Sequence, residues 1–335
     1  MGKLANYLVI RSLLAIPTIL VLVTLVFILM RLTGDPIAAM VGMKAPPEVI
    51  AELRHKAGLD LPIHEQYIRY ITGVFTGDLG KTLLYDRPVI KDILDHFPAT
   101  LELTIYSFII SVLIGVFTGT VAAINQGKFE DVLMRFYGIF TYAIFIPWFG
   151  LLLQMVFGNW LGIIPIGGRL SAYISPPPFI TGLYTIDSLL TGRLDAFFDA
   201  LRHLIGPSFT LGIVLSGSYT RIVRANLVDI LSQDFITAAR ARGLRDSLVI
   251  KHALKNALIP VITLMGLEFA ILLTGAVLTE TTFSWNGLGS YLVDMIRNSD
   301  YIAVQGTVVF FAIFVSIISV IVDALYAIID PRIRY

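Results

Sequence analysis

Three short motifs contain residue types that serve catalytic or nucleotide-binding sites in other proteins. The Gly-Lys-Thr run at 80–82 is typical of the end of a phosphate-binding loop, but Phe75 stands where that loop needs its first glycine. The His-Glu pair at 64–65 lacks the second histidine of a zinc-protease helix, and the Gly-Leu-Gly run at 287–289 lacks the third glycine of a dinucleotide-binding loop. The motifs therefore predict neither a nucleotide site nor a metalloprotease.

The residue counts exclude further kinds of chemistry. The 335 residues contain no cysteine and five histidines, which excludes disulfides, thiolate metal ligands and thiol catalysis and leaves little for a metal site. A formal net charge of +1 gives no basic surface for a nucleic-acid backbone. We therefore expect a protein without catalytic residues, metal or cofactor of its own, and without a nucleic-acid partner.

Four polar side chains lie within or near long apolar segments, where ionisable groups are costly and face a bundle interior or water. Three of them, Glu268, Gln154 and Asp323, are candidates for lining a polar pathway. The alternative for each is hydrogen bonding between helices, and the fourth, Glu102, lies close to a helix start.

The basic segment at 230–256 predicts two capped helices joined by a tight turn. Ser232 can cap the first helix, whose first turn is acidic and whose last turn is basic, and Gly243 follows where left-handed geometry is favoured. Asp246 or Ser247 then caps the second helix. A basic loop that only sets topology or contacts anionic lipid is the alternative explanation.

The composition indicates that lipid surrounds most of the chain. Hydrophobic residues make up 56% of the sequence and charged residues 15%, against about 45–50% and 25% in soluble domains. A helix needs about 20 mainly apolar residues to cross the hydrocarbon core. Six such stretches are present: Leu8–Met30, Ala99–Ile124, Val132–Phe157, Leu204–Ile222, Ala257–Thr279 and Ala303–Ile328. The sequence predicts an all-α membrane protein with six transmembrane helices in one domain, 1–335.

Lysine and arginine near the span ends predict the orientation. The segment at 230–256 is rich in both residues, and with six spans the two termini fall on its side of the membrane. This predicts a multi-pass protein of the cell membrane with cytoplasmic termini, a structured external loop at 32–98 and an irregular external cap at 158–201. The external loop is expected to contain three short helices, over Ala45–Leu59, over Pro62–Phe75 and from Pro88.

The segment at 230–256 also resembles a known motif. D-F-I-T-A-A-R-A-R-G-L from residue 234 and K-H-A-L-K-N-A-L-I-P from residue 251 are similar to the coupling-loop motif of binding-protein-dependent ABC importer permeases, in the form found in the dipeptide/oligopeptide family. One departure is Thr237, which replaces the glutamate that usually begins this motif. Further matches follow in the same order along nearly the whole chain, at 31–36, 77–80, 98–103, 280–289 and 330–335.

The resemblance implies the fold and partners of a type I ABC importer permease. It implies a second, homologous permease, two ATP-binding subunits that hold ATP and magnesium, and an extracytoplasmic solute-binding protein. This chain would be a non-catalytic subunit forming half of the pathway for di- or oligopeptides, with oligosaccharides, glutathione or nickel as alternative cargoes. The cytoplasmic coupling helix between spans four and five, which contacts an ATPase, would comprise Asp234, Phe235, Thr237, Ala238, Ala239, Arg240, Arg242 and Gly243.

The loop between spans five and six is the second candidate site. Its aromatic residues and turn formers predict an ordered, bent loop at interfacial depth. We expect Glu280, Phe283, Trp285 and Gly287 to close the pathway externally and to contact the binding protein. An aromatic anchor at the lipid interface is the alternative for Trp285.

Two other classes of membrane protein are rivals. An intramembrane hydrolase needs a nucleophile with a base, or two facing carboxylates at one depth. Glu268 with Asp323 is a candidate pair, whereas Ser216 and Ser218 have no evident histidine partner. A secondary transporter would have two inverted, similarly broken halves, which the sequence does not show. Co-purification with an ATPase would separate the importer from both rivals.

Overall fold

The structure is a computed structural model that describes residues 2–32, 37, 46–56 and 58–329. In these residues the chain is all-helical, as predicted: no strand forms, and Lys81 and Pro88 make an isolated antiparallel bridge. The chain divides into two compact units, one comprising Met1–Thr100 with Asn286–Val320 and the other comprising Leu101–Trp285 with Ile321–Tyr335.

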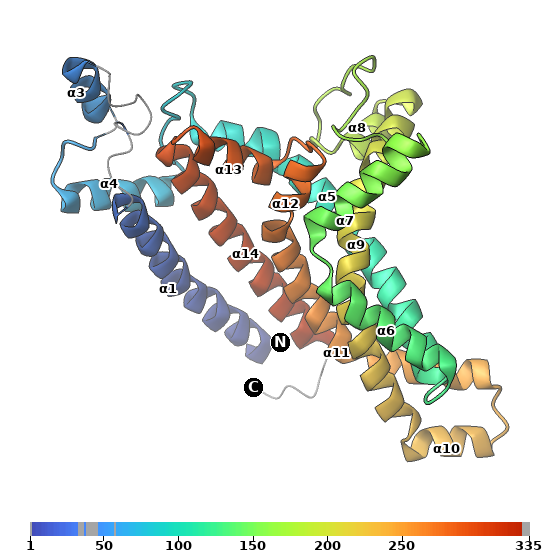
Figure 1. The fold of residues 1–335 in the computed structure, drawn as a ribbon. Coiled ribbons are helices and arrows are strands. Elements are labelled where there is room, and N and C mark those ends of the chain that lie inside the picture. The colour runs from blue at the N-terminus through green and yellow to red at the C-terminus, as the bar shows by residue number, and fades with distance from the viewer. Residues whose placement is uncertain (1, 33–36, 38–45, 57, 330–335) are drawn as a thin grey trace. The chain divides into compact units, whose positions relative to one another are not determined.

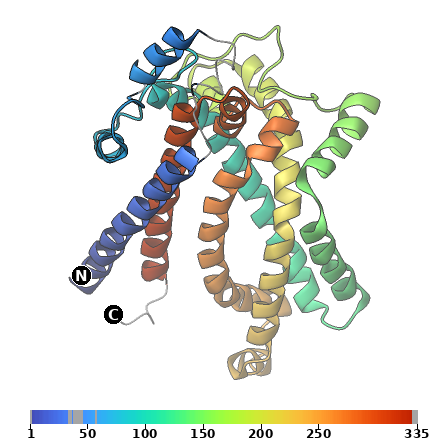
Figure 2. The ribbon, with the colours of Figure 1, turned by 60° about the vertical axis from the view of Figure 1, so that its left-hand side comes forward.

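The first unit has an aromatic and aliphatic core. Phe97 meets Phe310 and Phe314 with ring centroids 5.1 and 4.6 Å apart, and such ring pairs add about 0.5–1.5 kcal/mol beyond area burial. The first and last helices, α1 and α14, run side by side in Figure 1 and Figure 2. The unit contains α1 (Gly2–Leu32), α3 (Pro47–Lys56), α4 (Ile63–Thr76), α13 (Leu288–Arg297) and the first parts of α5 (Val89–Ile124) and α14 (Tyr301–Ile329).

Two of the three short helices predicted for the loop at 32–98 are confirmed. α3 starts at Pro47, where the fixed φ of proline suits a first turn, and α4 ends at Thr76, directly before Gly77 with its left-handed φ of 79°. The third is not separate, because α5 continues through Pro98 into the predicted second span. The packing of Phe97 against α14 holds this turn although proline removes one backbone hydrogen bond.

The second unit surrounds α9 (Leu194–Leu231), which approaches its neighbours closely. A Cβ at Gly217 would lie 2.1 Å from the Thr141 hydroxyl, and a Cβ at Gly115 would lie 2.3 Å from the Tyr219 Cβ. Small residues at such contacts are typical of packed membrane helices. The other complete helices of this unit are α6 (Phe129–Ala143), α7 (Ile146–Leu153), the π-helical η1 (Gln154–Trp160), α8 (Tyr184–Leu190), α10 (Asp234–Ala241), α11 (Asp246–Gly275) and α12 (Val277–Thr282).

The third predicted span is not one helix. α6 ends at Ala143, Ile144 and Phe145 have extended backbone, and the following α7 and η1 leave at 103° to α6. Pro147 lies in the first turn of α7 and has no N–H to continue the hydrogen bonds of α6. Hydropathy predicts that this segment is apolar but does not detect the bend.

Three described segments are long and apolar enough to cross a membrane: Leu13–Leu32, Val89–Ile124 and Tyr301–Ala324. The bent pair of α6 with α7 and η1, and the two halves of α11 bent by 46°, raise this number to five within the described part of the chain. The fourth predicted span lies inside α9 and is not among the five, because serine, threonine, glycine and charged residues make α9 less apolar than the other spans. The fourth span, Leu204–Ile222, therefore stays a prediction.

Candidate functional site

The α10 elbow, defined as residues 232–245, joins α9 to α11. In both ribbon views α10 lies at the far end of these two helices (Figure 1, Figure 2). One side chain anchors α10: Ile236 is 1% exposed and belongs to a cluster with Leu227 of α9 and with Val249 and Ala253 of α11. Burying one such side chain contributes about 1.5–3 kcal/mol, which supports a helix too short to be stable alone.

The turn after α10 confirms the backbone conformation predicted for Gly243. Its φ is 79°, its N–H donates to the Arg240 carbonyl at 2.9 Å, and the Leu244 N–H donates to the Ala239 carbonyl at 3.3 Å. These bonds satisfy carbonyls at the end of the helix. A Cβ at Gly243 would meet no atom within 4 Å, so the backbone conformation, and not a lack of space, favours glycine here.

The capping side chains predicted for the elbow are wrong. Ser232 Oγ donates to a carbonyl in the last turn of α9 at 2.7 Å, and the residue that precedes α10 as its N-cap is Gln233. α11 begins at Asp246 with Arg245 as its N-cap, so neither Asp246 nor Ser247 has the capping position. A carboxylate in the first turn still favours the helix through the macrodipole.

Most of the elbow faces outward. Phe235 is 43% exposed although it is aromatic, and the Arg240 Nε lies 4.0 Å from the Asp246 carboxylate in an exposed pair that contributes little. Aromatic and arginine side chains are enriched at the centres of protein interfaces. Apart from half-buried Ala239, the predicted coupling residues are all exposed: Asp234, Phe235, Thr237, Ala238, Arg240, Arg242 and Gly243.

The aromatic turn, defined as residues 280–285, buries its glutamate and its two aromatic side chains. Glu280, Phe283 and Trp285 are 0%, 1% and 1% exposed, and the Trp285 N–H donates to the Glu280 carbonyl at 2.8 Å. The Gly168 N–H donates to the Phe283 carbonyl at 2.9 Å, which joins the turn to the predicted cap. This burial disfavours an aromatic anchor, because an anchor places its ring at the lipid interface.

Gly287, the fourth residue predicted for the gate, belongs to the other unit. It is the N-cap of α13, with an extended φ of −103°, and its carbonyl accepts the Tyr291 N–H at 3.0 Å and the Ser290 hydroxyl at 2.8 Å. The bent loop expected after span five therefore leads into a helix that was not predicted.

Gln154, predicted as a pathway residue, forms hydrogen bonds to two neighbouring segments. Its Nε2 donates to the Ile166 carbonyl at 2.7 Å and to the Thr282 carbonyl at 2.9 Å. The amide thereby joins η1 to the cap and to the aromatic turn. This arrangement favours the alternative of hydrogen bonding between segments for Gln154.

A buried ion pair that the sequence analysis missed lies next to Trp285. Arg169 Nη2 donates to Glu102 Oε2 at 2.8 Å, and the two side chains are 9% and 1% exposed. The guanidinium lies 3.6 Å from the Tyr184 ring centroid and 5.6 Å from that of Trp285. Thr185 donates its N–H and its hydroxyl to Glu102 Oε1 at 2.8 and 2.7 Å. The sequence signal for this pair was an arginine, Arg169, placed directly after Gly167 and Gly168 in the predicted cap.

Comparison with known proteins decides between the classes of membrane protein. Residues 111–335 match the family described as binding-protein-dependent transport system inner membrane component. Residues 4–104 match the N-terminal part described for the same kind of membrane component. The chain belongs to this family. It is a membrane-embedded permease subunit of an ABC importer.

Three relatives align with the permease over most of both chains. The di/tripeptide transport system permease protein DppB of Pseudomonas aeruginosa is 39% identical over 325 residues, which cover 96% of each chain. The probable D,D-dipeptide transport system permease protein DdpB of Escherichia coli is 40% identical over 90% of the permease and 88% of the relative. The glutathione transport system permease protein GsiC of Salmonella typhimurium is 38% identical over 98% and 99%.

Two carboxylates of the permease lie on α11 and α14. Glu268 is 8% exposed, and its Oε2 has no hydrogen-bond partner among the described residues. Asp323 is half-buried. The two helices approach closely nearby, because a Cβ at Gly266 would lie 2.2 Å from the Val322 side chain. Since a buried carboxylate needs a polar partner or water, Glu268 stays a candidate pathway residue.

The permease also contains a serine, a histidine and an aspartate in one cluster of the cap. Ser171 Oγ donates to Asp199 Oδ1 at 2.8 Å and lies 3.3 Å from His203 Nε2. His203 Nδ1 lies 3.1 Å from the carbonyl oxygens of Gly167 and Gly168. A catalytic triad bonds the serine to the imidazole and the carboxylate to the other ring nitrogen, whereas here the carboxylate binds the serine. The cluster therefore gives no support to a hydrolase.

Asp187 organises the proline-rich part of the cap. Its carboxylate accepts the N–H groups of Ile180, Thr181 and Gly182 at 3.2, 2.8 and 2.9 Å and the Thr181 hydroxyl at 2.6 Å. Burial raises the pKa of Asp187, but these hydrogen bonds outweigh burial, and the pKa lies below the usual range of an aspartate. The cap is therefore built around a carboxylate that is ionised at neutral pH.

Proposed function

We propose that the permease imports di- or oligopeptides and forms half of their translocation pathway. The names of its relatives support this proposal, because they refer to di- and tripeptides, to D,D-dipeptides and to glutathione, which is itself a tripeptide. Oligosaccharides and nickel are the alternative cargoes. Uptake of a labelled dipeptide by cells with and without the permease, with labelled maltose and nickel as comparators, tests the assignment.

We propose that the α10 elbow docks into a groove of an ATP-binding subunit. The observation that carries this proposal is the contrast between Ile236, the buried anchor, and its exposed neighbour Phe235 beside basic side chains. Two such subunits would hold ATP and magnesium, so the permease needs no cofactor. When ATP closes them, the elbow would transmit that motion to α9 and α11, and ATP would shift the equilibrium through its different affinity for the two states.

The remaining partners are a second, homologous permease and an extracytoplasmic binding protein. We propose that the aromatic turn closes the pathway on the outer side. Its support is the packing of Phe283 and Trp285 against segments of the cap, with the Arg169 guanidinium near the Trp285 ring. A well-packed turn favours one closed arrangement, because packed cores resist continuous deformation. Trp285→Ala should therefore raise basal ATP hydrolysis of the assembled importer.

The proposed membrane arrangement has six spans with both termini in the cytoplasm of a cell-membrane protein. Cysteine labelling can test it cleanly, because the chain has no native cysteine. In intact cells, an impermeant thiol reagent should label Tyr173→Cys in the exposed cap and should not label Arg245→Cys in the elbow. Labelling of Arg245→Cys alone would show that the orientation is the reverse of the one proposed.

Gly243→Val tests the coupling role against a matched control. Gly243 and Gly127 both have a φ of 79°, and a Cβ at either would meet no atom within 4 Å. Valine at each position therefore introduces similar backbone strain, about 1 kcal/mol or more. Gly243→Val should abolish transport and solute-stimulated ATP hydrolysis, whereas Gly127→Val should retain both. Equal losses in the two variants would attribute the effect to strain and not to docking.

A further inference from the structure

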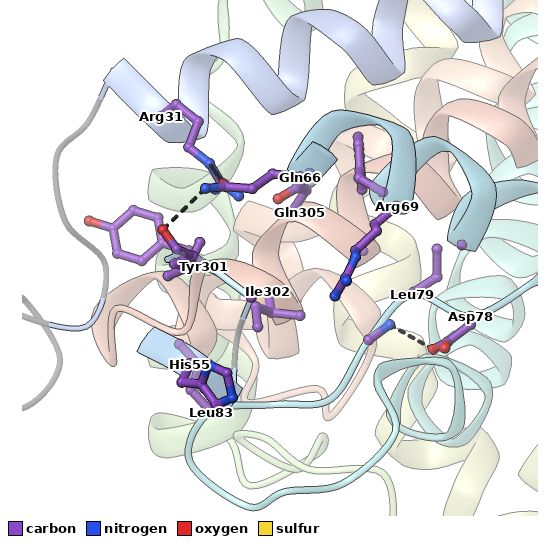
Figure 3. A pocket seen from close by; sticks show the side chains of 16 residues that line it. Arg31, His55, Gln66, Arg69, Asp78, Leu79, Leu83, Tyr301, Ile302 and Gln305 are labelled. Atoms are coloured by element: carbon purple, nitrogen blue, oxygen red, sulfur yellow. Dashed lines mark hydrogen bonds between the residues drawn. The ribbon is translucent and has the colours of Figure 1, made fainter. Parts of the chain in front are cut away.

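A polar cavity of about 380 Å³ lies within the first unit (Figure 3). It is bounded by the end of α1, the turn after α3, α4, the loop at 78–83 and the start of α14. Sites for small molecules commonly have volumes of about 300–1,000 Å³, so the cavity could hold a compact polar group. Its polar lining includes Arg31, Gln66, Arg69, Tyr301 and Gln305.

Two arginines give the cavity a positive charge. Arg31 donates its Nε to Gln66 Oε1 at 2.8 Å. Its guanidinium also lies 4.9 Å from the Phe27 ring centroid, and its terminal nitrogens make no hydrogen bond within the described residues. Arg69 is exposed and makes no hydrogen bond or ion pair within the described residues. Figure 3 shows both side chains directed at the same space from α1 and α4. The acidic lining residue Asp78 accepts the Gly80 N–H at 3.0 Å. The Nδ1 of His55, another lining residue, lies 2.7 Å from the Asp60 carboxylate.

The cavity adjoins the ends of two apolar spans. The apolar span of α1 ends at Leu32, directly after Arg31, and the apolar span of α14 begins at Tyr301, another lining residue. Arginine at a span end is positioned at the interface between hydrocarbon and water. Along the adjoining part of α1, Leu25, Ile28 and Leu29 are about half exposed, so an apolar surface for acyl chains continues from the polar cavity.

We propose that this cavity binds the phosphodiester group of a membrane phospholipid, with Arg31 and Arg69 as its donors. Guanidinium groups bind phosphate oxygens through paired hydrogen bonds that are stronger than neutral ones. The acyl chains would lie along α1 over Leu25, Ile28 and Leu29. Free phosphate has the same chemistry but would not contact the apolar surface of α1. We therefore assign the phosphate group to a lipid.

The test measures lipid retention by the full-length permease, purified in detergent and delipidated. Dioleoyl phosphatidylglycerol is titrated and its binding read by native mass spectrometry. Arg69→Gln should weaken binding about fivefold or more, since it removes charged hydrogen bonds, and Arg69→Lys should lose less. Arg69 makes no hydrogen bond or ion pair within the described residues, and its interaction with Asp60 is only long-range, so its loss should change the melting temperature little. Arg297→Gln, on an exposed arginine of the same unit paired with Asp294 at 3.9 Å, should bind lipid like the wild type.

Other outcomes would overturn the assignment. Equal lipid binding by wild type, Arg69→Gln and the double variant Arg31→Gln/Arg69→Gln would show that the cavity holds no lipid phosphate. Inorganic phosphate is titrated in parallel: arginine-dependent binding of phosphate without retention of phosphatidylglycerol would make free phosphate the ligand. A variant that keeps lipid binding but loses association with the external binding protein would identify the cavity as a docking site for that protein.

Discussion

The aromatic turn with its cap and the α10 elbow are stabilised in opposite ways. Around the turn, charged and polar side chains are buried and bonded to one another, as in the pair of Arg169 with Glu102 and the two bonds of the Gln154 amide. The elbow has one fully buried anchor, Ile236, which was not among the predicted coupling residues, and leaves those predicted residues exposed or half-buried.

The difference shows which region finds partners for its side chains within its own chain. Buried charges are retained only when partners compensate for the loss of water, and in the cap Glu102 has those partners in Arg169 and Thr185. An exposed aromatic such as Phe235 gains nothing from its own chain, so a partner must cover it to obtain the free energy of burial. The cap specifies its own structure, whereas the elbow presents a surface for another subunit.

The largest effect on stability is expected for Arg169→Ala. Removing one partner of a buried pair leaves an uncompensated charge, here the Glu102 carboxylate, and costs about 3–5 kcal/mol. Thermal unfolding in detergent should show a strong loss for Arg169→Ala and almost none for Arg297→Ala, whose pair with Asp294 is exposed. Similar melting temperatures for the two variants would contradict the view that the cap stabilises itself.

Neighbouring residues of α10 sharpen the comparison. Ile236→Ala removes the anchor and should cost about 2–5 kcal/mol of local stability, measured as faster hydrogen exchange across α10. Phe235→Ala should change stability by less than about 0.5 kcal/mol because the ring is largely exposed, yet it should abolish solute-stimulated ATP hydrolysis. If Phe235→Ala retained solute-stimulated ATP hydrolysis, the proposal that Phe235 belongs to a docking surface would be contradicted.

Gly243→Ala should have a smaller effect and lower the stability of the elbow by about 1 kcal/mol, because alanine tolerates the left-handed conformation poorly. The added Cβ would meet no neighbouring atom, so no steric clash adds to this cost. Partial loss of transport with normal membrane insertion is expected. Quantitative uptake assays, normalised to the amount of permease in the membrane, measure it.

The smallest effect at neutral pH concerns Asp187. Because its pKa is lowered in the folded cap, it contributes stability that is fully present above the unfolded pKa and is lost as pH falls through the folded pKa. Proteolysis of the cap at acidic pH should therefore increase more steeply in the wild type than in Asp187→Asn. Parallel pH profiles would mean that the carboxylate does not organise the cap.

Local signals in the sequence predicted local structure well. The proline at the start of α3 and the glycine after α10 act through their own backbone conformations, so residues near each turn sufficed. The capping role of Ser232 failed because its hydroxyl can bond in two directions, and the carbonyl of α9 was the acceptor.

Features that depend on distant partners were not predictable from the sequence. Arg169 and Glu102 are 67 residues apart, and no local pattern brings them together. The bend of the third span depends on where Pro147 interrupts an apolar run, which hydropathy alone does not register. α13 was missed because the turn formers before it predicted a loop, whereas Gly287 starts a helix.

Cross-linking at Ala238 tests the central claim most directly. Ala238 is exposed on α10, and the permease has no cysteine of its own. In membranes that contain the assembled importer, Ala238→Cys treated with a short thiol-to-amine reagent should form a product with an ATP-binding subunit, and Tyr173→Cys in the cap should not. If Ala238→Cys gives no such product while Tyr173→Cys does, the α10 elbow is not the surface that receives the ATPase.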